Sequence, residues 1–152
     1  MVGCGKKDNV QETVSMFDLR TKMLEAGTNL PEMLSVSDSD ADPEKLLSYV
    51  SDLPYEKVDR FFISYSADGK ADEIVVLAVK DIADVDLAKQ SLEQHQQERL
   101  KLLREYEPKE VQRLEQALFF VKEQYAIMIV CEQKEDIKTA FEKFLEDNGG
   151  EK

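Results

Sequence analysis

The sequence predicts an α+β fold centred on a four-stranded antiparallel sheet made of two β-hairpins. Each hairpin is predicted from two short apolar segments with a polar turn between them, at 58–80 and 117–132. Each is followed by apolar residues at helical spacing, which gives the order β-β-α-β-β-α. The length of 152 residues suits one such domain with a hydrophobic core, to which an additional N-terminal helix is added.

The N-terminal helix is predicted at 10–26, where apolar side chains recur at helical spacing. Asn9 and Glu12 form a capping-box pattern at its start. Gly27 is expected to end the helix in the left-handed conformation, which glycine adopts without steric cost. Residues 1–8 before it are expected to be a tether.

An acidic, serine-rich linker is predicted at 28–42, before a short helix that begins at Pro43 and ends near Val50. Its "DSDAD" sequence, starting at Asp38, resembles the beginning of a calcium-binding loop. Such a loop requires glycine at its sixth position and glutamate at its twelfth. Those positions hold proline and tyrosine here, so we interpret the segment as a solvated linker.

The strands are predicted from alternating or continuous apolar residues bounded by turn residues. Residues 74–92 align without a gap on 126–144, strand on strand and helix on helix, which suggests a pseudo-repeat. The four predicted strands are 58–66, 73–80, 117–122 and 125–132.

Two longer helices are predicted after the hairpins. Asp84 is expected to cap a helix over 84–106, and Pro108 breaks it and begins a further helical turn through Leu114. Asp136 begins the last helix of the domain. Both longer helices are expected on one face of the sheet.

The second strand of each hairpin is apolar on both faces, so the sheet is expected to be covered on both sides. The candidates for the second face are the N-terminal helix, the 43–50 helix and a second copy of the chain, and we favour the N-terminal helix. The domain is therefore predicted to span 9–148, with helix and linker at 9–57 and the ββαββα core at 58–148.

The composition excludes several classes of protein. The net charge is −12, from 20 basic and 32 acidic residues, so nucleic acids and anionic lipid head groups are poor partners. No segment has the roughly 20 apolar residues of a membrane-spanning helix. Cys131 ends an apolar strand and is interpreted as a small buried hydrophobe, whereas Cys4 lies in the terminal tether.

No motif for catalysis, cofactor binding or metal binding is present. The single histidine, His95, lies on or beside the apolar stripe of the 84–106 helix and is expected to be a surface or boundary residue. The glycines form no phosphate-binding loop, and the histidine and cysteines are too few for a usual zinc site. We therefore expect no cofactor and no metal, and favour a protein that is not an enzyme.

Four phenylalanines occupy equivalent places in the two hairpins: Phe61 and Phe62 in the first, Phe119 and Phe120 in the second. Their simplest interpretation is a hydrophobic core. If one sheet face is uncovered, some of them would instead form a binding surface, because contiguous exposed apolar area usually marks one.

Three segments carry a family resemblance: "ADEIVVLAVKD" at 71–81, "YEPKEVQRLEQA" at 106–117 and "YAIMIVCE" at 125–132. With these, the chain from Tyr49 to about Leu145 resembles the bacterial family called domain of unknown function DUF4358. The resemblance implies an envelope-attached protein of Gram-positive bacteria that is made with a lipoprotein signal. It implies no catalytic residue.

The resemblance also gives a reading of Cys4. Val2-Gly3-Cys4 matches the end of a lipobox, whose cysteine becomes lipidated, although Met1 stands where leucine is usual. A signal peptide also needs about 7–15 apolar residues before this site, and the sequence shows none there. We expect the sequence to start at the end of a removed signal. As written it would be soluble and not lipidated.

Three functions follow as hypotheses. The first is an extracytoplasmic, lipid-anchored module that binds a partner or serves in the envelope without catalysis. The second is an enzyme or small-ligand-binding protein with a cleft beside the sheet, lined by convergent polar groups such as His95 or paired carboxylates. The third is a self-associating structural module that forms a homodimer.

Overall fold

The computed structural model describes residues 15–148 of the chain. Internal contacts divide the chain into two compact units. One unit consists of Leu30–Glu132 and contains the sheet. The other combines the segment before residue 30 with the segment from Gln133 onward. The prediction of a single domain over 9–148 is not tested by this division and stays a prediction.

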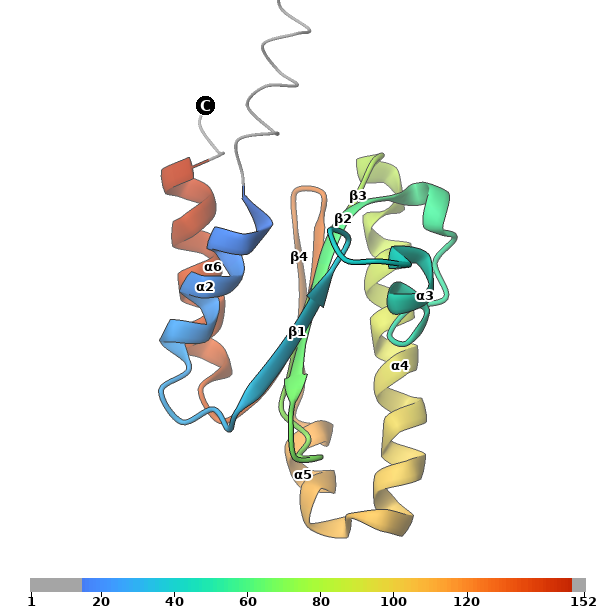
Figure 1. The fold of residues 1–152 in the computed structure, drawn as a ribbon, viewed down its shortest axis with the longest axis vertical. Coiled ribbons are helices and arrows are strands. Elements are labelled where there is room, and N and C mark those ends of the chain that lie inside the picture. The colour runs from blue at the N-terminus through green and yellow to red at the C-terminus, as the bar shows by residue number, and fades with distance from the viewer. Residues whose placement is uncertain (1–14, 149–152) are drawn as a thin grey trace, which may run out of the picture. The chain divides into compact units, whose positions relative to one another are not determined.

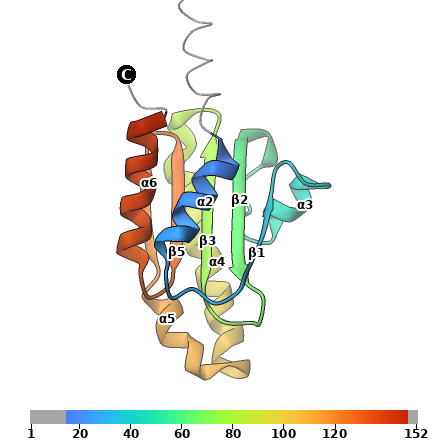
Figure 2. The same cartoon turned by 60° about the vertical axis from the view of Figure 1, so that its left-hand side comes forward.

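The sheet has five antiparallel strands, not the four that the sequence predicts. Their order is β1-β2-β3-β5-β4, so the two predicted hairpins meet through the central pair β3 and β5. Figure 2 shows the strands beside one another. The bounds are β1 Met33–Ser37, β2 Val58–Ser66, β3 Glu73–Val79, β4 Leu118–Lys122 and β5 Tyr125–Val130.

The fifth strand, β1, lies within the segment predicted as a linker. It pairs with β2 at the sheet edge, where Val36 is opposite Ile63. The hydroxyls of Ser35 and Ser64 lie 2.7 Å apart across the pair. A short edge strand needs few buried side chains, so β1 lacks the apolar run that marks β3 and β5.

Helix α4, Val85–Tyr106, lies along one face of the sheet and contacts β3, β5 and β4 (Figure 1). Two short helices, α3 at Pro43–Ser48 and α5 at Val111–Glu115, complete this layer. Alternate strand residues point toward it because side chains alternate across a strand. The core on this face includes Phe61, Ile63, Val75, Leu77, Val79, Ala88, Leu92, Leu100, Leu114, Ala126, Met128 and Val130.

In this unit the helix starts follow the predicted signals with one difference; in the other unit, α6 begins at Lys134 rather than at the predicted Asp136. Pro43 and Pro108 each occupy the first turn, of α3 and of the 3₁₀ turn Pro108–Glu110, as predicted. Asp84 precedes α4, but its side chain makes no capping hydrogen bond and instead pairs with Lys57 Nζ at 3.4 Å. Asp81 caps the preceding 3₁₀ turn by accepting from Ala83 N, which corrects the expected capping residue.

In the other unit, helices α2 (Met16–Ala26) and α6 (Lys134–Asn148) pack side by side (Figures 1 and 2). Ser15 caps α2 by accepting from Asp18 N at 3.1 Å. The predicted capping box at residues 9 and 12 lies outside the described residues. Gly27 ends α2 as predicted, but with φ −93 rather than in the left-handed conformation, which corrects that detail.

The side chain of Gln133 joins the two ends of this unit. Its Oε1 accepts from Asn29 N at 2.7 Å, and its Nε2 donates to Thr28 Oγ1 at 2.6 Å. Helices α2 and α6 belong to one unit, and the sheet and α4 belong to the other. Two expectations therefore stay predictions: that the N-terminal helix covers the second face of the sheet, and that both long helices lie on one face. Among the described residues, no helix combines the length and apolarity needed to span a bilayer.

Candidate functional site

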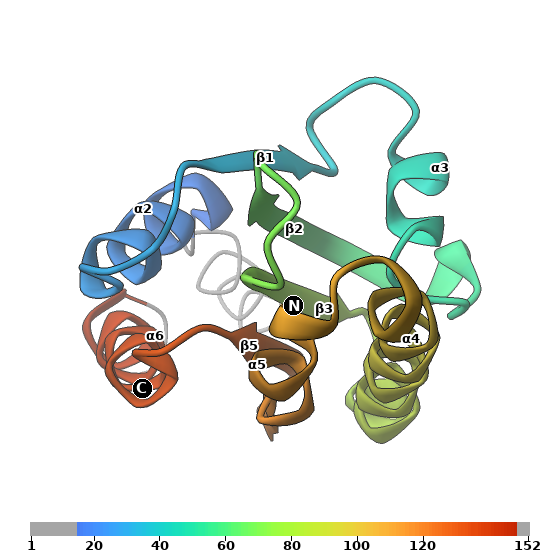
Figure 3. The same ribbon diagram turned by 90° about the horizontal axis from the view of Figure 1, so that it is seen from below.

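A pocket of about 380 Å³ opens on the α4 face of the sheet, between α4 and α3. Its place follows from the widths of the layers. Five strands at about 4.8 Å spacing make a sheet about 19 Å across, whereas one helix is about 10 Å wide. Helix α4 covers β3, β5 and β4, and only the six-residue α3 lies over β1. Figure 3 shows the two helices on the same side of β2. The incomplete cover leaves the pocket over β2.

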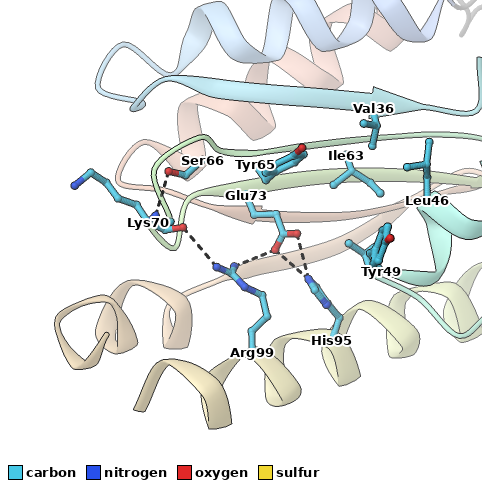
Figure 4. A pocket seen from close by; sticks show the side chains of 12 residues that line it. Val36, Leu46, Tyr49, Ile63, Tyr65, Ser66, Lys70, Glu73, His95 and Arg99 are labelled. Atoms are coloured by element: carbon cyan, nitrogen blue, oxygen red, sulfur yellow. Dashed lines mark hydrogen bonds and ion pairs between the residues drawn. The ribbon is translucent and has the colours of Figure 1, made fainter. Parts of the chain in front are cut away.

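The floor of the pocket is a network of three charged or polar side chains (Figure 4). Glu73, at the start of β3, accepts from His95 Nε2 with both carboxylate oxygens at 3.1 Å. Arg99 Nη1 donates to Glu73 Oε1 at 3.0 Å. The side chains of Glu73, His95 and Arg99 are only 7%, 11% and 23% exposed, so the network is shielded from bulk water.

His95 and Arg99 reach the same carboxylate because they are four residues apart on α4. That spacing places both side chains on one helix face. Glu73 is in step with Val75 and Leu77, whose side chains point into the core under α4. The strand therefore presents a carboxylate to the helix at the one position where the apolar core gives way to the pocket.

The turn between β2 and β3 is fixed to the same helix. Arg99 Nη1 also donates to Ala71 O at 3.0 Å, and Nη2 donates to Lys70 O at 3.5 Å. Glu110 Oε1 accepts from Ala71 N at 2.7 Å. Within this turn Gly69 has φ +82, a conformation that favours glycine. The pocket wall at this end is thus held by two helical segments, α4 and the 3₁₀ turn Pro108–Glu110, rather than left as a loose loop.

A second buried carboxylate lies behind the turn, next to the pocket. Asp72 is 1% exposed, and Arg113 Nη1 is 3.4 Å from its Oδ1. Burial raises the pKa of Asp72, and the nearby Arg113 guanidinium partly offsets this rise. Asp72 therefore contributes to the turn and to the pH dependence of stability, not to the pocket lining.

The other walls are apolar and aromatic. Val36 of β1, Leu46 of α3 and Ile63 of β2 line the end away from the charged network (Figure 4). Tyr49 and Tyr65 also line the pocket, and these residues are 63% and 38% exposed. In the described part of the chain, neither tyrosine hydroxyl has a hydrogen-bond partner. The pocket therefore has an apolar end and a polar end.

The four phenylalanines do not gather into one patch. Phe61 is fully buried in the core under α4, and Phe119 packs partly buried against the same core. Phe62 and Phe120, their neighbours in sequence, point to the opposite face. Strands β2 and β4 are separated by β3 and β5, about 14 Å apart. Their role as a binding surface stays a prediction, and Cys4 lies outside the described residues.

The sequence predicted a surface or boundary position for His95, and its side chain, 11% exposed, lies at the boundary of the core. Sequence reasoning missed Glu73 and Arg99. One signal could have identified them: Glu73 occupies an inward-facing position of an otherwise apolar strand. A carboxylate there needs partners, and His95 and Arg99 at helical spacing on one helix could supply them.

Two further features of the described residues bear on chemistry. An open polar groove of about 580 Å³ lies on another side of α4, lined mainly by glutamine and glutamate. In the described part of the chain, no group of three or more histidine, cysteine, aspartate or glutamate side chains could hold a metal ion. Cys131 is buried, as the sequence predicts.

The family comparison agrees with the division of the chain. The family described as domain of unknown function DUF4358 matches residues 32–131. The chain belongs to this family. The matched segment coincides closely with the unit Leu30–Glu132, so the DUF4358 domain consists of the sheet, α4 and the pocket. Comparison with curated proteins and with solved structures gave no match.

Proposed function

We propose that this DUF4358 protein is a non-enzymatic ligand-binding module and that its ligand occupies the pocket between α3 and α4. The observation that carries the proposal is the pocket itself, in which a shielded Glu73–His95–Arg99 network lies beside apolar walls. Pockets of about 300–1,000 Å³ with mostly apolar walls and a few convergent polar groups are typical of small-molecule sites.

Binding is favoured over catalysis because the one carboxylate at the polar end, Glu73, is already engaged by His95 and Arg99. His95 Nε2 contacts both oxygens of Glu73, and Arg99 contacts the same carboxylate. A general base needs an accessible acceptor within reach of the substrate proton. Ser66, the serine that lines this pocket, donates its hydroxyl to Asp68 Oδ1 at 2.5 Å and is not directed to His95.

Chemical-shift mapping with ¹⁵N-labelled protein tests the proposal. A panel of octyl compounds with different head groups should shift amide resonances around Tyr49, Ile63 and Lys70. Val36→Phe should fill the apolar end and abolish these shifts. Val121→Phe is the matched control, since it makes the same change on the other edge strand, β4, where Val121 is 38% exposed. If no compound shifts these resonances, the binding role is refuted.

The proposed place of action is outside the cytoplasm, with the domain anchored through a lipid on Cys4. The support is the lipobox-like Val2-Gly3-Cys4 ending and the lipoprotein signal that the family resemblance implies. Anchoring through acyl chains would make the membrane a site of attachment rather than a partner. Metabolic labelling with an alkyne fatty acid should mark the protein expressed with its natural upstream sequence, and Cys4→Ala should remove the label. Unlabelled protein in the cytosol would refute the proposed location.

A second candidate function is self-association through β4. This strand forms an edge of the sheet, and its Val121 is exposed. An apolar edge strand can pair with the same strand of another copy. Light scattering on the purified chain tests this function: a dimer that Val121→Lys converts to a monomer supports it, and a monomer at high concentration refutes it.

A further inference from the structure

We infer that the ligand of the pocket is an amphiphilic anion, with an apolar body and a carboxylate-type head group. This inference rests on the proposed binding function and adds the chemical class of the ligand. It follows from two features of the pocket: an excess of hydrogen-bond donors at the polar end, and a wall continuous with the hydrophobic core at the other.

A count of the hydrogen bonds in the Glu73–His95–Arg99 network shows the excess of donors. Among the residues that line the pocket, Glu73 supplies the carboxylate. Both of its oxygens already accept from His95, and Oε1 also accepts from Arg99. Arg99 has five N–H donors, of which three have acceptors within the described residues. The hydroxyls of Tyr49 and Tyr65 supply two more groups that can donate. A ligand at this end therefore meets donors that lack acceptors.

An acceptor group that carries negative charge fits these donors best. Hydrogen bonds between ionised partners are shorter and about twice as strong as neutral ones. One carboxylate, Glu73, balances the charge of Arg99. The remaining acidic side chains act from outside the pocket, and salt screens them over about 8 Å at physiological ionic strength.

The apolar end defines the body of the ligand. Val36, Leu46 and Ile63 are the residues that would be covered, and Ile63 and its neighbours belong to the core under α4. Removing this apolar surface from water favours binding of an apolar ligand body. The two ends lie in one cavity of about 380 Å³, so a single small molecule can use both. A small hydrophilic anion would use only one end.

Titration calorimetry with three ligands of equal chain length tests the head-group preference: octanoate, octan-1-ol and octylammonium, below their aggregation concentrations and at physiological salt. Octanoate should bind at least about tenfold more tightly than the other two, since hydrogen bonds to a charged group are about twice as strong as neutral ones. Acetate, which has the head group alone, should bind at least about tenfold more weakly than octanoate.

Two pairs of variants locate the site. Arg99→Gln should weaken octanoate binding about tenfold. Arg104→Gln is its control on the same helix, because Arg104 is 54% exposed and forms only a surface pair with Glu115. Leu46→Gln should weaken binding of all three octyl compounds, whereas Leu102→Gln, at a position that is 60% exposed, should not. Circular dichroism confirms that each variant is folded.

The outcomes separate the two proposals. Preference for octanoate that is lost in Arg99→Gln supports the inference. Equal or tighter binding of octan-1-ol or octylammonium in the pocket overturns the anionic ligand class and leaves the binding function in place. Absence of binding by all three overturns both. Octanoate binding that survives both Arg99→Gln and Leu46→Gln also overturns the inference, because it places the anion elsewhere.

Discussion

Replacing Glu73 with glutamine tests whether the buried network holds the pocket together. Glutamine keeps the shape of glutamate but has one acceptor oxygen, so it can satisfy either His95 or Arg99. Its amide group would face the other donor. The side chain is 7% exposed and makes three polar contacts of 3.0–3.1 Å. Losing one charge-assisted bond while Arg99 stays partly buried should reduce the free energy of unfolding by about 2 kcal/mol.

For a chain of this size, that loss corresponds to a decrease in Tm of about 4–8 °C. Far-UV circular dichroism during urea and thermal unfolding measures it, since the chain has no tryptophan. Glu93→Gln is the control, because Glu93 pairs with Lys89 at 3.0 Å on the exposed face of α4. That change should cost about 0.5 kcal/mol or less. If Glu73→Gln costs no more than Glu93→Gln, the network does not stabilise the fold and the reasoning is refuted.

Three further predictions concern the turns and the buried acid. Asp72→Asn should gain stability relative to the wild type as pH rises from about 4, measured by urea unfolding at several pH values. The reason is that the pKa of Asp72 in the folded state is raised above its value in the unfolded state. Between these two pKa values the folded wild type binds more protons than the unfolded chain, so it loses stability as pH rises. A stability difference that does not change with pH would contradict this. Gly69→Ala should lower the free energy of unfolding by about 1 kcal/mol through its φ of +82 alone, since nothing lies within 4 Å of an added Cβ; an unchanged Tm would contradict it. Glu123→Gly should raise that free energy by about 1 kcal/mol, because Glu123 has φ +54; a lower Tm would count against it.

The sequence predicts the two central hairpins well because their signals are strong. Strand β2 was predicted with the bounds that the structure has, and β3, β5 and α4 differ by one or two residues. Continuous apolar runs and helical spacing over many residues leave few competing structures. The starts of two short segments were also predictable, at Pro43 and Pro108, because proline suits the first helical turn.

The sequence did not predict β1, because an edge strand of five residues is specified by its neighbour rather than by its own composition. Asp38, which the sequence predicts in a solvated linker, accepts from Phe61 N at 3.0 Å and helps to hold β1 at the edge. That interaction depends on which segment lies next to β2 in space. Local spacing carries no information on it.

The pocket was predictable only in part. His95 was visible as the single histidine and as a boundary residue of its helix. Its partners were not, because the contact between Glu73 and α4 joins residues that are 22 positions apart in the chain. The volume of the pocket depends on how far α3 and α4 leave β2 uncovered. This depends on the packing of separate elements and is not encoded in any one motif.

A crystal structure of the chain grown with octanoate tests the central claim most directly. We predict density for one octanoate in the pocket, with its carboxylate within hydrogen-bond distance of Arg99 and its chain against Val36 and Ile63. An empty pocket in crystals whose octanoate binds elsewhere would contradict the account. So would an octanoate in the pocket with its carboxylate directed away from Arg99.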